Sequence, residues 1–127
     1  MRTEIELLLI GIGGAIGAIS RYGISKLAHK FTVTSFPLAT LIANLAGCFF
    51  IGVLLGSGQA EKNDPIRLGF GVGFLGALTT FSTFGGETMN QLSDGNWPVA
   101  LANVLLNVVL GLLLVFLGML AGRKLAA

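Results

Sequence analysis

The chain has 127 residues, of which 54% are hydrophobic and only 11% are charged. Soluble domains usually carry about 25% charged residues, so this composition excludes an ordinary water-exposed surface and indicates a lipid bilayer as the solvent. The net charge of +2, without a basic run or basic–aromatic alternation, also excludes the usual pattern of a nucleic-acid-binding protein.

Four apolar stretches, taken in chain order, are long enough to cross a bilayer, which requires roughly 17–25 helical residues. We expect spans at about residues 5–27, 37–58, 65–91 and 98–122, joined by short connections within one transmembrane domain of residues 1–127. The first apolar run is similar to a secretory signal, but Glu4 and Glu6 interrupt its basic start, so we interpret it as a retained helix. The predicted fold class is an all-α membrane protein with four transmembrane helices.

The basic residues give only a weak preference for one orientation in the membrane. Four spans place both termini and the second connection on one side. That side holds five basic residues and the other side three: Arg2, Lys62, Arg67, Arg123 and Lys124 against Arg21, Lys26 and Lys30. Because positive charge sets topology, so small a bias leaves open that two copies insert in opposite directions as an antiparallel dual-topology homodimer.

Glycine pairs occur in every span at a spacing that permits close helix packing. Small residues four positions apart let the backbones of membrane helices approach each other. These pairs are Gly13/Gly17, Gly52/Gly56, Gly69/Gly73 and Gly118/Gly122.

The third span contains a segment, residues 76–87, that is a poor helix former. It combines four hydroxyl residues within five positions, two phenylalanines and flanking glycines. We therefore expect the third helix to be broken near its middle, because irregular backbone at membrane depth is tolerated only in a protein interior or beside a watery cavity. The alternative is an intact helix whose hydroxyls bond to the preceding turn.

Phenylalanines and asparagines supply the other candidate site residues. Phe81 and Phe84 lie three positions apart, so their positive ring edges could attract a small anion, although ordinary packing is the alternative. Asn44 lies in the middle of the second span, where its amide could donate to an anion or tie two helices together. Asn103 and Asn107 share a face of the fourth span, where helix–helix adhesion is again the alternative.

At this point the residues resemble one known family. The string Gly76-x-Leu78-Thr79-Thr80-Phe81-Ser82-Thr83-Phe84-x-x-Glu87 closely resembles the signature of the small bacterial fluoride channels, the Fluc or CrcB family. The segments Gly17-x-x-x-Arg21-Tyr22 and Thr40-Leu-x-x-Asn44-Leu-x-Gly47 match it as well, so the resemblance covers essentially the whole chain. It implies passive, fluoride-selective export from the cytoplasm through two pores of an antiparallel homodimer in a bacterial inner membrane.

The resemblance also implies roles for single residues. It assigns Arg21 to a vestibule and the carbonyls of Gly76 and Thr79, from both subunits, to a structural sodium ion (Na+) at the dimer centre. The residues that it assigns to the fluoride pathway are Asn44, Phe81, Ser82, Thr83, Phe84 and Asn107.

This chain departs from the family pattern at two places. Ala77 follows Gly76 where a glycine pair is frequent, and Gly111 and Val115 stand where the fourth helix usually carries hydroxyls. Asn103 and Asn107 then preserve only the outer half of a polar track.

Two other function classes are the alternatives. A small dual-topology multidrug or cation exporter needs a carboxylate embedded in the first span, and a holin-like assembly protein has no use for the phenylalanine pair. Enzymatic activity is not expected, because no nucleophile–base pair is present and His29 falls in a predicted connection at residues 29–36. Cys48 is the single cysteine and is interpreted as a packing residue.

Overall fold

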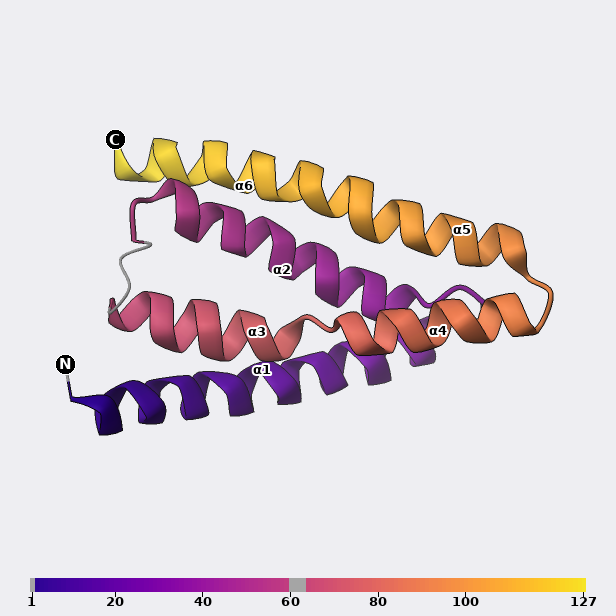
Figure 1. Cartoon of the computed structure of the whole chain (residues 1–127), viewed down its shortest axis with the longest axis horizontal. Coiled ribbons are helices and arrows are strands. Elements are labelled where there is room, and N and C mark those ends of the chain that lie inside the picture. The colour runs from indigo at the N-terminus through magenta and orange to yellow at the C-terminus, as the bar shows by residue number, and fades with distance from the viewer. Residues whose placement is uncertain (1, 60–63) are drawn as a thin grey trace.

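The structure is a computed structural model that describes residues 2–59 and 64–127, so Lys62 lies outside the described residues. Four of its helical segments are long and apolar enough to cross a membrane: Thr3–Phe31, Leu38–Gly56, Arg67–Ser93 and Trp97–Ala126. The start of the first and the end of the last lie at the same end of the molecule (Figure 1). The chain is a multi-pass membrane protein.

The first two spans are single helices, α1 (Thr3–Phe31) and α2 (Leu38–Gly56). The expectation that His29 lies in a connection is wrong, because α1 continues to Phe31 and places His29 in its last turn. No glycine or proline follows Gly23 within α1, so nothing in the local sequence stops the helix before Thr32, whose backbone N–H closes the last turn on the carbonyl of Ala28.

The third and fourth spans are composite. The fourth combines α5 (Trp97–Leu105), the π-helical turn η2 (Leu106–Leu110) and α6 (Gly111–Ala126). The third begins with the π-helical η1 (Arg67–Leu75) and the short α3 (Gly76–Leu78), and it ends with α4 (Phe81–Ser93).

Thr79 and Thr80 lie between α3 and α4 and are extended. Their φ/ψ angles are −83°/153° and −149°/114°, and Figure 1 shows the thin segment that they form. Thr80 is the N-cap of α4, since its side chain accepts a hydrogen bond from the Thr83 N–H. We call Thr79–Thr80 the interruption of the third span.

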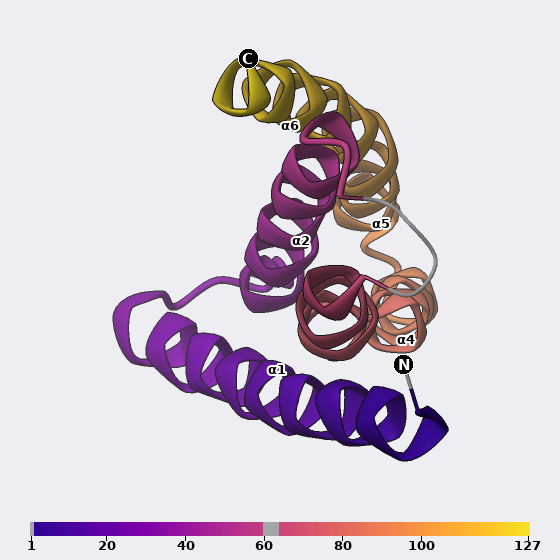
Figure 2. The same ribbon diagram turned by 90° about the vertical axis from the view of Figure 1, so that its left-hand side faces the viewer.

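The glycine pairs hold the spans together two by two. A side chain on Gly17 would overlap the carbonyl of Phe74, and one on Gly118 would overlap the carbonyl of Phe49. The pairs of the first and third spans thus face each other, as do those of the second and fourth, and close packing at glycine is confirmed. Figure 2 shows the two helix pairs that this packing produces: α1 runs beside the start of the third span, and α2 runs beside α6.

The interior of one chain is thin. Among residues 2–59 and 64–127 the buried apolar side chains are Leu41, Ala43, Leu54, Leu68, Leu75, Leu78, Phe84 and Ala100. Four polar residues, Thr40, Thr80, Thr88 and Asn103, are buried with them. Most large apolar side chains of α1 and α6 are exposed, as expected for helices that face lipid or another protein.

The packing predicts unequal effects of alanine at two glycines of α1. Gly17→Ala should lower the free energy of unfolding by about 1–3 kcal/mol, because its methyl group meets the Phe74 carbonyl. Gly11→Ala is the matched control, since open space surrounds that position, and alanine should change stability by at most about 1 kcal/mol there. Reversible denaturation in mixed micelles measures both, and equal effects would contradict the proposed contact.

Candidate functional site

The interruption is held by a single side chain from the second span. The Thr80 N–H donates to Asn44 Oδ1 at 2.8 Å, and Asn44 Nδ2 donates to the Thr80 carbonyl at 3.3 Å. The side-chain amide therefore pairs with the Thr80 backbone in both directions, as a neighbouring strand would. Without this pair, a buried peptide group in the middle of a span would lack its partners.

Four backbone carbonyls, those of residues 76–79, lose their helical donors at the interruption, and Gly76 and Thr79 are two of them. In a continuous α-helix the Thr80 N–H would bond to Gly76 and the Thr83 N–H to Thr79. The first donates instead to Asn44 and the second to Thr80 Oγ1 at 3.2 Å. The carbonyls of Gly76 and Thr79 are thus left without the donors that a regular helix would supply.

A cavity of about 400 Å³ adjoins the interruption. Asn44, Phe81, Phe84 and Asn107 line it together with Gly76 and Thr79, so six of the residues that the sequence singled out meet at one place. The Phe81 and Phe84 rings lie 5.5 Å apart between centroids at 54°. Phe84 is buried, whereas 82% of Phe81 is exposed in the single chain. We call this space the phenylalanine cavity.

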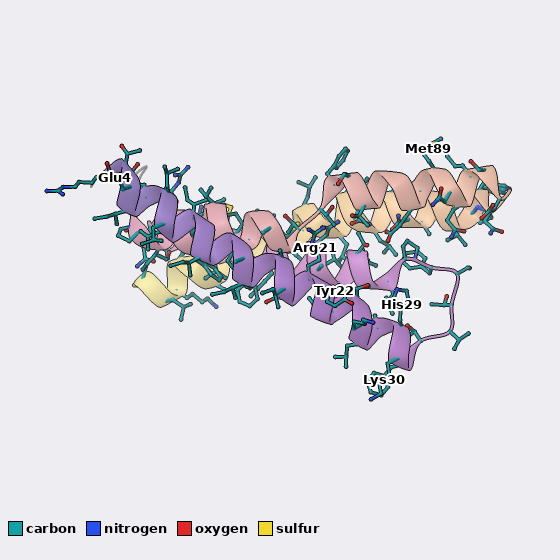
Figure 3. The ribbon with its side chains drawn as sticks, turned by 90° about the horizontal axis from the view of Figure 1, so that it is seen from below. Glu4, Arg21, Tyr22, His29, Lys30 and Met89 are labelled. Atoms are coloured by element: carbon teal, nitrogen blue, oxygen red, sulfur yellow. The ribbon has the colours of Figure 1, made fainter. Side chains whose placement is uncertain are left out.

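A second cavity, of about 300 Å³, lies between the C-terminal half of α1, the start of α2 and α4. Arg21, His29, Thr83 and Glu87 line it, and Glu87 Oε1 accepts a hydrogen bond of 2.8 Å from Thr40 Oγ1. Figure 3 shows Arg21 and His29 on the side of α1 that faces the other helices, whereas Lys30 points away. We call this space the arginine cavity.

Thr80 lines both cavities. Its hydroxyl donates to Thr83 Oγ1 at 3.0 Å and lies 3.3 Å from Ser82 Oγ. Of the two hydroxyl residues that were expected between the rings, Thr83 lines the arginine cavity, whereas Ser82 contacts the Thr80 hydroxyl but lines neither cavity. Sequence reasoning did not select Thr80 because it is one of four hydroxyl residues within residues 79–83, and the sequence does not show which of them faces a cavity.

The side-chain amides of Asn44, Asn103 and Asn107 all form hydrogen bonds within the chain. Asn44 Nδ2 donates to Asn107 Oδ1 at 2.9 Å as well as to Thr80, so Asn44 makes the interhelical tie that the sequence left open as the alternative. Asn107 Nδ2 donates in turn to Asn103, and Asn103 Nδ2 donates to Thr88 Oγ1. Thr88 was not a candidate, because its pairing with Asn103 depends on how α4 and α5 pack.

A family model described as CrcB-like protein, Camphor Resistance (CrcB), matches residues 8–119. A protein of Dehalococcoides mccartyi named fluoride-specific ion channel FluC is 46% identical over 122 residues, 94% of each chain. Proteins of the same name from Shewanella putrefaciens and Shewanella frigidimarina are each 47% identical over 114 residues, covering 89% of this chain and 92% of theirs.

The Asn44–Thr80 pair predicts that the side chain maintains the interruption. Asn44→Ala leaves the Thr80 N–H without its acceptor and should lower the free energy of unfolding by about 1–3 kcal/mol. It should also accelerate hydrogen exchange at the Thr80 amide. Asn90→Ala, at an exposed asparagine of α4, is the control. An equally protected Thr80 amide in Asn44→Ala would show that something else holds the interruption.

Proposed function

Because the chain belongs to the CrcB family, we propose that it is a fluoride-selective channel, and not an enzyme, that lets fluoride leave the cytoplasm passively. The proposal depends on one observation: Thr80 lines both cavities, the one beside Arg21 and the one beside the phenylalanine pair. An anion pathway needs an entrance that attracts negative charge and a narrow section that replaces water. The arginine cavity supplies the entrance, and the phenylalanine cavity supplies the narrow section.

The arginine cavity serves as the entrance. Arg21 provides a positive charge that raises the local concentration of anions. At its inner wall the Thr83 hydroxyl accepts a hydrogen bond from Thr80, so among the described residues its own hydrogen is left to donate to an ion. Fluoride can therefore exchange some of its water for hydroxyl donors before it leaves the entrance.

The narrow section lies at Asn44 and the phenylalanine pair. The bond from Asn44 Nδ2 to the Thr80 carbonyl is long, at 3.3 Å, so an anion can compete for that hydrogen at small cost. The edges of Phe81 and Phe84 add partial positive charge without a full cation that would retain the ion. Several weak donors around a small space favour fluoride over the larger chloride.

We propose that two copies assemble as an antiparallel dual-topology homodimer with two pores, in the bacterial cytoplasmic (inner) membrane. Phe81 and Ser82 are exposed in the single chain although they lie near the middle of a span. Hydroxyl groups facing lipid there are unfavourable, and a partner would cover them. A twofold axis in the membrane plane returns the middle of each span to the same depth, so the two interruptions would meet.

We further propose that the carbonyls of Gly76 and Thr79 from both copies hold a structural sodium ion. Their helical donors are diverted, so their lone pairs are available to a cation. Sodium is a hard cation that oxygen atoms bind, and backbone carbonyls are oxygen ligands of this kind. The ion would supply a fixed positive charge that ties the two subunits together.

The alternative of a small cation exporter is favoured by no observation. Glu4 and Glu6 lie in the first turn of α1, and Glu87 lies on α4, so none is embedded in the first span.

Substitution of the rings tests the pathway. Phe81→Ile or Phe84→Ile removes a ring edge and should lower fluoride efflux from liposomes at least about tenfold, equivalent to about 1.4 kcal/mol in the barrier, while the dimer persists. Phe116→Ile, on the exposed face of α6, is the control. An ion-selective electrode measures efflux, and undiminished efflux from both ring variants would refute the proposed role of the ring edges.

Reporter fusions test the dual topology. A C-terminal alkaline phosphatase is active only outside the cytoplasm and a C-terminal green fluorescent protein only inside, so both should give a signal. Replacing Arg123 and Lys124 with glutamine removes two charges from the terminal side and should increase phosphatase activity at the expense of fluorescence. A signal from one reporter alone, unchanged by the substitution, would indicate a single orientation.

A further inference from the structure

A ladder of side-chain hydrogen bonds connects three of the four spans. It starts at the Thr80 N–H, which donates to Asn44 Oδ1 at 2.8 Å. Asn44 Nδ2 donates to Asn107 Oδ1 at 2.9 Å, and Asn107 Nδ2 donates to Asn103 Oδ1 at 2.9 Å. Asn103 Nδ2 then donates to Thr88 Oγ1 at 3.0 Å, and the Thr88 hydroxyl donates to the Phe84 carbonyl at 2.8 Å. We call these residues the amide ladder.

The ladder can run in only one direction. Its first group, the Thr80 N–H, can only donate, and its last group, the Phe84 carbonyl, can only accept. Each amide between them accepts with its oxygen and donates with its nitrogen. Reversing Asn44 or Asn107 would place oxygen against oxygen on one side and N–H against N–H on the other, and the Thr80 peptide group, which bonds to both Oδ1 and Nδ2 of Asn44, fixes the start of the ladder.

The far half of the ladder is dry. Asn103 is 0% exposed and Thr88 is 9% exposed. A buried amide that loses its partner has no water to replace it, so the orientation of Asn103 is held firmly. Both ends of the ladder lie on the third span four residues apart, one at each side of Phe81, so the ladder also fastens the first turn of α4 to α2 and to α5.

We propose that Asn103 and Thr88 are positioning residues that, together with the Thr80 peptide group, stabilise the orientation of the Asn44 amide in the phenylalanine cavity. They lie outside the residues that line that cavity and act through Asn107. With the ladder intact, Asn44 turns its NH₂ group toward Asn107 and its oxygen toward the Thr80 N–H. With Asn44 reversed, an oxygen would stand where an anion needs a donor. The consequence for conduction rests on the proposed fluoride function.

Two substitutions at Thr88 isolate this role. Thr88→Val keeps the shape of the side chain but can neither accept from Asn103 nor donate to Phe84, whereas Thr88→Ser keeps the hydroxyl. The side-chain NH₂ signal of Asn44, followed by NMR in ¹⁵N-asparagine-labelled protein, should shift or split in Thr88→Val and remain in Thr88→Ser. Fluoride efflux from liposomes should fall roughly fivefold to tenfold in Thr88→Val, the loss expected for one or two hydrogen bonds.

A second position tests whether the ladder acts as a unit. Asn103→Leu should reproduce both effects, and it decides the matter if Thr88→Val does not fold. The double variant should conduct no less than the poorer single variant, because either change already breaks the same chain of bonds. Asn90→Leu, at an exposed asparagine, is the control.

The outcomes separate this proposal from the function on which it rests. An Asn44 signal unchanged in both Thr88→Val and Asn103→Leu overturns the ladder, whatever the chain conducts. Losses of efflux that multiply in the double variant overturn it as well, because independent damage would then explain them. Absence of fluoride efflux from the unsubstituted protein overturns the proposed function instead, and the Asn44 signal alone then decides the orientation proposal.

Discussion

The requirement that every peptide group within a bilayer find a partner governs this structure. A helix meets it automatically, and the extended pair Thr79–Thr80 does not. Asn44 restores both bonds of the Thr80 peptide group from the neighbouring helix. The interruption is therefore stabilised by Asn44, which α2 places at hydrogen-bonding distance from Thr80, and the phenylalanine pair follows directly in α4.

That closeness depends on glycine. The contacts between α1 and the start of the third span, and between α2 and α6, bring backbone against backbone and leave no room for side chains. As a consequence, few side chains are buried within one chain, and most large apolar side chains of α1 and α6 are exposed. Such a chain has its exact form only in surroundings that are themselves apolar, whether lipid or a second copy.

Hydropathy and spacing were sufficient for the number of spans and the packing at glycine. They were insufficient for the exact end of a helix and for hydrogen bonds between side chains of different spans. The helical state of His29 was missed because the end of α1 is set by Thr32 and the absence of a breaker, and not by loss of apolar character. Asn44 and Asn107 were selected as candidates, but their mutual bond, and the link through Asn103 to Thr88, require the packed positions of three spans.

The interruption also resets the helical phase of the third span. Two extended residues advance the chain by about 3.3 Å each, against 1.5 Å in a helix, and they end the regular turn of about 100° per residue. Residues before Leu78 and after Phe81 therefore do not share one helical wheel. Inserting or deleting a single residue in α4 would rotate its later part against α5, whereas the same change before Gly76 would rotate η1 against α1. The two halves of the third span therefore pack independently, η1 against α1 and α4 against α5. The number of residues in each half must be kept for its own packing to persist.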